Sequence, residues 1–362
     1  MKRKSPSNRL LSLQALRGIA ILTVFVDHAH LVNKLGSWGV VIFFIMSGFL
    51  MTLNYMEQGR INKISILSNI QFAFSRFRKL LPLHIVTMLS LALLELLGSY
   101  HTPIPEILMK IFMNTTLQFD WFPDFGNFLI NPSAWFISAL WFSYFIFPWL
   151  LKYMEKHSDC NSAIYSIIIL SLLQITLSLI ILHIPEGGAA ENFIFNHREY
   201  LIYMFPPMTL IEFMIGAWFG IIYLSNFNIP KNKTTASILE TIVVIINLLL
   251  IPYMLKEKCN VFWLTLPCAC LVYLFALQKG CISGFLTNKL LIFFGDYSME
   301  IFLIHYPISR YLEAAVAIVL GRDIVNKGMT IFNITIGLLL TLLCSYIWKQ
   351  ISKQLKMHFK SN

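Results

Sequence analysis

The chain of 362 residues is 57% hydrophobic and only 13% charged, and it carries a formal net charge of +10. Ordinary soluble domains carry about 25% charged residues, so this composition excludes that class and indicates an all-α integral membrane protein. Because a helix needs about 20 apolar residues to cross a bilayer, we predict a bundle of about ten transmembrane helices. The predicted spans are 11–32, 36–56, 80–100, 134–151, 162–183, 200–224, 236–255, 261–279, 290–312 and 329–348.

Basic residues orient the predicted bundle. Of the 28 Lys and Arg residues, 19 lie in the two terminal segments and in the loops on their side, 8 lie in the opposite loops, and Arg17 lies within a span. Cytoplasmic loops are enriched in Lys and Arg. We therefore expect both termini in the cytoplasm, with basic segments 1–10 and 349–362 flanking one membrane domain, 11–348. The positive charge then reflects topology and contact with the lipid bilayer, and no nucleic-acid partner is expected.

The first predicted span contains charged and ionisable side chains that a membrane helix does not need for stability: Arg17, Asp27, His28 and His30. A charge at the centre of a membrane helix costs about 2.5–3.5 kcal/mol on insertion scales, and such residues usually have a function. Arg17 and His28 share nearly the same helix face and lie about 16 Å apart along the axis. This pattern predicts an elongated anionic molecule bound along the helix. His30 points to another face, and structural and functional roles are equally open for it.

The next polar positions lie within the second span and just before the third. Ser47 and Gly48 belong to the segment SGFLM, and the loop before the third span ends in RFRKLLP. That loop places Arg76 and Lys79 at the mouth of the bundle, on one face if the stretch is helical. The segment 104–119 is patterned as an amphipathic helix that could lie at the interface.

Two later spans are expected to be irregular, the sixth because of two adjacent prolines and the ninth because it is unusually polar. The sixth contains Glu212. The ninth contains Ser298 and His305, which are seven residues apart and so share a face. The cysteines predict no disulfide framework, because only Cys259 lies on the predicted outer side, where we expect it to be the native thiol most readily labelled from outside. No Cys/His spacing typical of a metal site occurs, so no metal is expected.

The motif Arg17-x10-His28, followed by SGFLM, resembles the membrane acyltransferase-3 family over about residues 11–348. IEFMIGAWFG and FFGDYSMEIFLIHYP resemble the family's sixth-span and ninth-span motifs. Family members O-acylate extracytoplasmic polysaccharides, lipopolysaccharide, peptidoglycan or related molecules in bacteria. The resemblance therefore implies a multi-pass protein of the bacterial cytoplasmic membrane that is an O-acyltransferase, most simply an O-acetyltransferase. It also implies acyl-CoA, most simply acetyl-CoA, as donor substrate, no tightly bound cofactor, and a cell-surface glycan or glycolipid as acceptor.

The chain departs from the family pattern at several positions. Lys79 stands where a second arginine is usual, which keeps the charge but loses bidentate geometry. Met299 replaces a usual tyrosine. In the middle of the chain, AWFISALWFSY has Leu140 and Trp141 where many members carry an acid. A carboxylate from this span is therefore not expected to take part in the reaction.

These residues suggest a division of roles. The basic residues Arg17, Arg76 and Lys79, with Ser47 and Gly48, are predicted to bind the donor, whose phosphates accept charge-assisted hydrogen bonds. His28 is predicted to take the proton of the acceptor hydroxyl, with Asp27 as a candidate partner, and an acyl-histidine intermediate remains an alternative. Candidate residues on the acceptor side are Glu212, Ser298 and His305, although His305 could instead simply cap a proline-broken helix.

Two other functions are compatible with the residues alone. A transporter or flippase also places charges within the membrane, although no recognisable inverted repeat supports one. A non-catalytic scaffold for polysaccharide assembly would tolerate the loss of His28.

Overall fold

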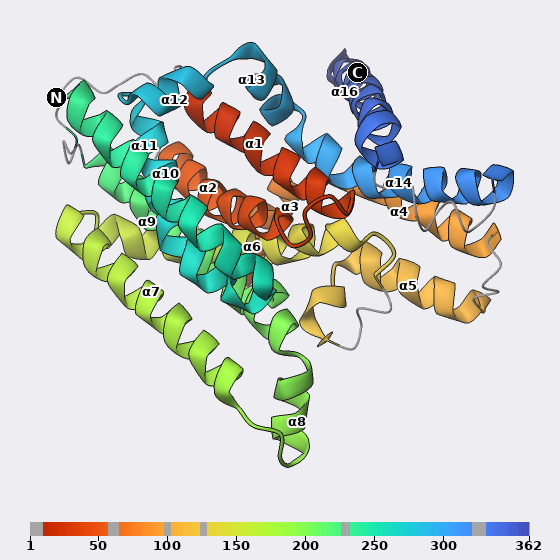
Figure 1. Cartoon of the computed structure of the whole chain (residues 1–362), viewed down its shortest axis with the longest axis horizontal. Coiled ribbons are helices and arrows are strands. Elements are labelled where there is room, and N and C mark those ends of the chain that lie inside the picture. Colours follow the sequence, from red (N-terminus) through yellow and green to blue (C-terminus); the bar gives the residue numbers. More distant parts are fainter. Residues whose placement is uncertain are drawn as a thin grey trace.

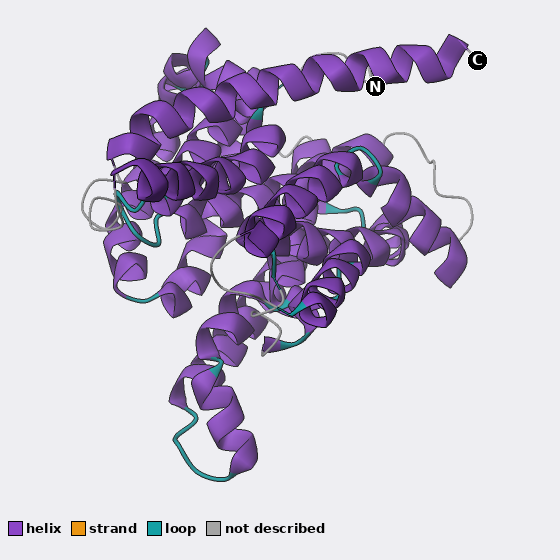
Figure 2. Cartoon of the chain, turned by 90° about the vertical axis from the view of Figure 1, so that its right-hand side faces the viewer, coloured by secondary structure: helices purple, strands orange, loops and turns teal. Residues whose placement is uncertain are grey.

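The computed structural model describes residues 10–56, 65–97, 103–123, 129–225, 230, 232–320 and 331–361. Throughout these ranges the chain forms helices and no strand, which confirms the predicted all-α fold (Figure 2). The helices pack into one bundle in which α1 lies between α2 and α13 (Figure 1).

The α-helices differ widely in length, from one and a half turns to more than six. Their bounds are α1 Leu11–His28, α2 Gly36–Met56, α3 Ile66–Phe77, α4 Leu81–Leu97, α5 Ile104–Thr116, α6 Trp135–Lys156, α7 Cys160–His183, α8 Ala189–Asn196, α9 Pro206–Leu224, α10 Lys233–Lys256, α11 Thr265–Leu277, α12 Cys281–Leu286, α13 Lys289–Asp296, α14 Ser298–Leu320 and α16 Leu338–Ser361. Short 3-10 helices are η1 Phe119–Trp121, η3 Pro132–Ala134 and η5 Lys258–Leu264, and π-helical turns are η4 Tyr200–Met204 and η6 Asn333–Gly337.

Nine helical segments within the described ranges are long and apolar enough to cross a membrane, and the bent pair α3–α4 raises the number to as many as ten. This agrees with the prediction of about ten spans. The two helices of the pair meet at 69°, so part of the predicted loop 57–79 is the helix α3. The first eight residues of that loop, and residues 1–9 of the predicted amino-terminal segment, lie outside the described residues.

The two spans expected to be irregular are irregular. The π-helical turn η4 precedes α9, and the segment predicted as the ninth span is divided into α13 and α14. The polar residues Asp296 and Ser298 lie on either side of this break, at the end of α13 and the start of α14. π-Helical turns are frequent at functional sites, and the second irregularity begins the helix that carries His305.

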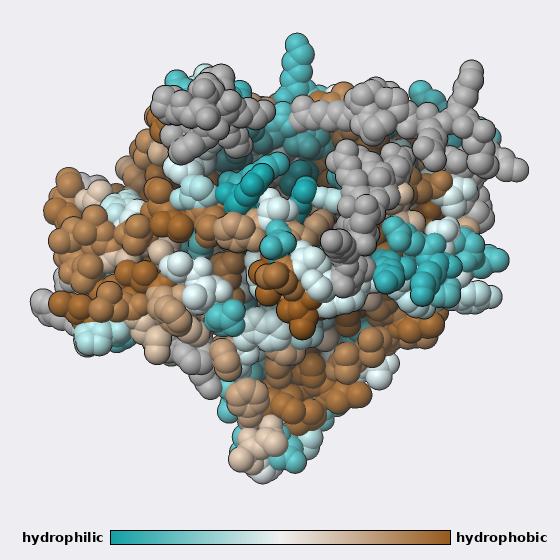
Figure 3. All heavy atoms as spheres, turned by 180° about the vertical axis from the view of Figure 1, so that it is seen from behind, coloured by the Kyte–Doolittle hydropathy of each residue, from teal (hydrophilic) through white to brown (hydrophobic). Residues whose placement is uncertain are grey.

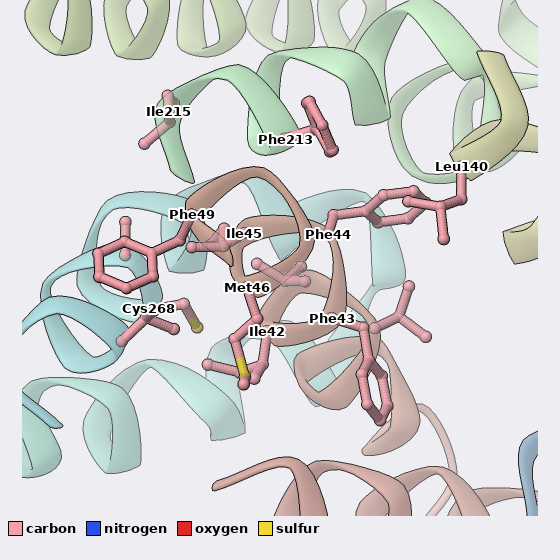
Figure 4. Close-up of a cluster of buried hydrophobic side chains, with 14 of the residues drawn as sticks. Ile42, Phe43, Phe44, Ile45, Met46, Phe49, Leu140, Phe213, Ile215 and Cys268 are labelled. Carbon is pink, nitrogen blue, oxygen red and sulfur yellow. The ribbon is translucent and has the colours of Figure 1, made fainter. Parts of the chain in front are cut away.

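Helix α2 is the centre of the core. Figure 4 shows its side chains, from Ile42 to Phe49, pointing toward α6, α9 and α11 on several sides. Its closest neighbour is α9, and two glycines permit the approach: a Cβ atom on Gly48 would overlap the carbonyl oxygen of Phe213, and one on Gly216 would overlap that of Ile45. Small residues let membrane helices approach backbone to backbone.

The outer helices expose apolar side chains. Leu172 of α7, Leu249 of α10 and Leu339 of α16 are 58%, 71% and 68% exposed. Hydrophobic residues accordingly form broad patches on the surface in Figure 3. An apolar surface over a buried core that contains polar groups is the arrangement expected of a multi-pass membrane protein.

The six cysteines are free, as the sequence predicted. The expectation that Cys259 would be the native thiol most readily labelled from outside is wrong, because its side chain is packed into the core and is only 9% exposed. Cys281, at the start of α12, is instead the exposed thiol.

Candidate active site

His28 is the last residue of α1, and it meets His305 of α14 at the centre of the candidate site. Nδ1 of His28 lies 2.8 Å from Nε2 of His305, and the ring centroids are 4.9 Å apart. The second nitrogen of His305, Nδ1, lies 2.9 Å from the carbonyl oxygen of Ile301. His305 is 3% exposed, whereas His28 is half-buried. The fold thus joins two histidines that are 277 residues apart in the sequence.

A proline explains how the segment around His305 is held. Pro307 lies inside α14 and has no N–H, so the carbonyl of Leu303, four residues earlier, loses its usual helical partner. The side-chain amide of Asn131 donates to that carbonyl at 3.1 Å. Asn131 also accepts the backbone N–H of Ser133, whose hydroxyl oxygen lies 3.5 Å from Nε2 of His305. The segment that brings the Ser133 hydroxyl beside the histidine pair therefore also supplies the hydrogen-bond donor for the Leu303 carbonyl.

The histidine pair opens onto a small cavity. Its lining comes from the end of α1, from α14 and from the π-helical turn η6, and the residues are Phe25, His28, Ala29, His305, Ser309 and Gly337. Ser309 is one turn beyond His305 on the same face of α14. The cavity therefore presents two imidazoles and a hydroxyl on an otherwise apolar wall.

Asp27 has a structural role that its neighbour in sequence does not share. Its carboxylate accepts the backbone N–H groups of Lys34 at 2.7 Å and of Gly36 at 3.0 Å, so it holds the turn between α1 and α2 and begins α2. His30 lies in that turn with a φ of 59° and is exposed. A catalytic role for Asp27 stays a prediction, and these two hydrogen bonds hold the turn before α2.

At the other end of α1, called here the Arg17 end, side chains from four helices converge. Tyr144 of α6 lies within electrostatic reach of Arg17 and Arg76 and within hydrogen-bonding reach of Ser47. The guanidinium of Arg76 also lies 5.3 Å from the ring centroid of Tyr55. The structure thus brings together Arg17, Arg76 and Ser47, three of the five residues predicted to bind the donor. No contact of Lys79 places it in this group, and it is exposed.

The other predicted site residues lie elsewhere. Glu212 is buried between α9 and α7, where Gln174 donates to it at 3.4 Å. Ser298 is buried at the first residue of α14, two turns before His305. Gly48 lies at the crossing of α2 and α9, which accounts for the absence of a side chain there. Roles of Glu212, Ser298 and Gly48 in binding stay predictions.

Sequence reasoning missed the residues that complete the pair: Asn131, Ser133, Ser309 and Gly337. Only a weak signal was available, namely that a proline inside a membrane helix frees a carbonyl that some polar side chain must satisfy. Nothing in the sequence told which side chain that was. Among the described residues there is no group of three His, Cys, Asp or Glu side chains that could hold a metal ion.

Comparison with known proteins agrees with this architecture. The acyltransferase-3 family model, described as an acyltransferase domain, matches residues 10–348. The acyltransferase MdmB of Streptomyces mycarofaciens is 22% identical over 332 residues, which cover 84% of this chain and 80% of that protein. No solved structure shows a significant match. With as many as ten candidate spans and a family match over nearly its whole length, the chain belongs to the acyltransferase-3 family and is a multi-pass membrane acyltransferase.

Proposed function

We propose that this protein moves a short acyl group, most simply acetyl, from acyl-CoA in the cytoplasm to a hydroxyl of an extracytoplasmic glycan or glycolipid. In this proposal the protein lies in the bacterial cytoplasmic membrane, the Arg17 end faces the cytoplasm, and the histidine pair faces the acceptor. The observation that carries the proposal is the contact of 2.8 Å between His28 and His305 beside a cavity.

The reaction needs a proton acceptor next to the attacking hydroxyl. As the hydroxyl oxygen forms a bond with the thioester carbonyl carbon, its proton passes to His28. The tetrahedral intermediate then collapses, the carbon–sulfur bond breaks, and the proton leaves His28 for the departing thiolate. Free CoA and the acyl ester are the products, and His28 returns to its neutral form.

The donor is long enough to bridge the two ends of α1. CoA carries phosphates at one end and a thioester at the other, and Arg17 and His28 lie about 16 Å apart along the helix axis. The convergence of Arg17 and Arg76 on Tyr144 supports a phosphate site at the Arg17 end. Guanidinium groups suit phosphate because they donate hydrogen bonds in a fixed fork.

The test compares His28→Ala with His30→Ala in membranes that contain equal amounts of each protein. We expect His28→Ala to reduce acceptor acylation by about 10²–10⁴-fold, the usual contribution of a general base, while acyl-CoA still binds. His30→Ala is the matched control, because His30 is exposed in the turn beyond α1 and should retain most activity. The readouts are mass spectrometry of cell-envelope glycans and binding of radiolabelled acetyl-CoA.

The opposite pattern would reject the assignment of the base. If His28→Ala keeps near wild-type transfer while His30→Ala is inactive, His28 is not the proton acceptor. If the envelope glycans of cells with and without the protein carry identical acyl groups, the acceptor class is wrong.

A further inference from the structure

We propose that His305 is a positioning residue that fixes the tautomer and orientation of His28 through a chain of hydrogen bonds starting at the carbonyl of Ile301. The inference rests on the proposed function, because it concerns the same base. It adds which nitrogen of His28 is the base and which group sets it.

This series of hydrogen bonds begins at the carbonyl oxygen of Ile301, which can only accept a hydrogen bond. Nδ1 of His305 lies 2.9 Å from the carbonyl oxygen of Ile301, so this nitrogen carries the hydrogen and donates. A neutral imidazole has one N–H, and burial of His305 at 3% exposure favours the neutral ring. Nε2 of His305 therefore carries a lone pair and accepts.

The tautomer of His28 follows from its contact with His305. Its Nδ1 lies 2.8 Å from Nε2 of His305, which needs a donor, so Nδ1 of His28 carries the hydrogen. In neutral His28 the lone pair then belongs to Nε2, which we assign as the base. When Nε2 takes a proton from the acceptor, Nδ1 keeps its own hydrogen, so the contact with His305 survives in both protonation states.

The packing around His305 is suited to hold this geometry. Asn131 ties the broken turn of α14 to η3 through the carbonyl of Leu303, and Ser133 lies 3.5 Å from Nε2 of His305. His305 also packs against Phe25 and Phe302, with ring centroids 6.2 Å and 6.3 Å away. An imidazole held on several sides keeps its acceptor aimed at His28, which is the role a second group plays in orienting a catalytic histidine.

The activity test uses two substitutions of different chemistry. In His305→Gln the side-chain amide reaches the position of Nε2, and its oxygen accepts the hydrogen of Nδ1 of His28. In His305→Leu the side chain keeps much of its volume but accepts nothing. We expect His305→Gln to keep acyl transfer within about 10-fold of wild type and His305→Leu to lose about 10²-fold or more in kcat, with KM for acyl-CoA unchanged in both.

His84 provides the matched control. It is another fully buried histidine, on α4, and its Nε2 lies 3.0 Å from the carbonyl oxygen of Asn114. His84→Leu reports the general cost of replacing a buried imidazole in this bundle. If His84→Leu reduces kcat as much as His305→Leu does, or if His305→Gln is as inactive as His305→Leu, the positioning role is overturned.

A second measurement does not depend on activity. ¹⁵N spectra of histidine-labelled protein in nanodiscs distinguish protonated from unprotonated ring nitrogens, and spectra of His28→Gln and His305→Gln identify the two residues. We expect a protonated Nδ1 on His28 in the wild type and a shift toward the other tautomer in His305→Leu. A wild-type His28 protonated at Nε2 alone would overturn the inference. Failure of the proposed function itself would be seen in a different experiment, as acyl transfer that is retained in His28→Ala.

Discussion

At the scale of single residues, Arg17 and His28 lie toward opposite ends of α1 and are predicted to serve one site. Both face groups from other helices: Arg17 lies near Tyr144 of α6, and His28 contacts His305 of α14. The sequence could identify these positions because charge in a membrane span is costly and is seldom retained without a function. It could not identify their partners, since helical periodicity reports faces of one helix and not which helices meet.

Arg17 allows a direct test of donor binding. We expect Arg17→Ala to weaken binding of acyl-CoA by about 10–100-fold, because a hydrogen bond to a charged group contributes about 1.5–3 kcal/mol. Isothermal titration with purified protein and a non-hydrolysable acetyl-CoA analogue measures the change. Dephospho-CoA analogues should lose less affinity in the variant if the missing phosphate is the one that Arg17 contacts.

Arg78 is the control for this measurement. It is exposed at the end of α3, two residues beyond Arg76, and it is not among the residues predicted to bind the donor. Arg78→Ala should leave affinity within about two-fold, as expected for a solvent-exposed charge. Equal losses in the two variants would show that general positive charge attracts the donor and that Arg17 makes no specific contact.

At the scale of helices, the sequence predicted the lengths of the membrane-spanning helices better than the places where they are interrupted. Bilayer thickness sets the length of a span, so the hydropathy pattern located α2, α7 and α10 to within a few residues of their observed bounds. The bend between α3 and α4 and the division between α13 and α14 were only partly anticipated. Such breaks depend on which polar groups and carbonyls find partners on neighbouring helices, and Asn131 with Leu303 is an example.

The crossing of α2 and α9 yields a prediction about stability. We expect Gly48→Ala to destabilise the protein, because the added methyl group would overlap the carbonyl oxygen of Phe213 and force the two helices apart. Overpacking of this kind costs about 1–3 kcal/mol. Thermal unfolding in detergent, followed by fluorescence-detected size-exclusion chromatography, should show a lower midpoint and less monodisperse protein.

Gly284 is the matched control, because a Cβ atom there meets nothing within 4 Å. Gly284→Ala in α12 should unfold at the wild-type temperature or slightly above it, since alanine favours helix more than glycine does. An unchanged midpoint in Gly48→Ala, together with weaker acyl-CoA binding, would argue instead that Gly48 serves the donor site.

At the scale of the whole molecule, the proposed function needs a particular orientation. Acyl-CoA is expected at the Arg17 end and the acceptor at the histidine pair, so the protein must place Arg17 toward the cytoplasm. The 19 basic residues on the side of the termini, against 8 in the opposite loops, predict this direction. The fold does not depend on it, because a bundle packs identically in either orientation.

Exposed cysteines on the two faces can test the orientation. Cys281 is exposed at the start of α12, on the predicted cytoplasmic side, and the other native thiols are buried or half-buried. Glu191 is exposed in α8, a helix without buried residues on the predicted outer side. In intact spheroplasts, an impermeant maleimide should label Glu191→Cys strongly and the wild type weakly. After permeabilisation the wild type should become labelled at Cys281, and Cys281→Ser should remove that signal.

Strong labelling of Cys281 in intact spheroplasts, with Glu191→Cys reactive only after permeabilisation, would show that the protein has the opposite orientation in the membrane. The histidine pair would then face the cytoplasm, and acceptors would have to be sought among cytoplasmic molecules, because an active site cannot use a hydroxyl that lies on the opposite side of the bilayer.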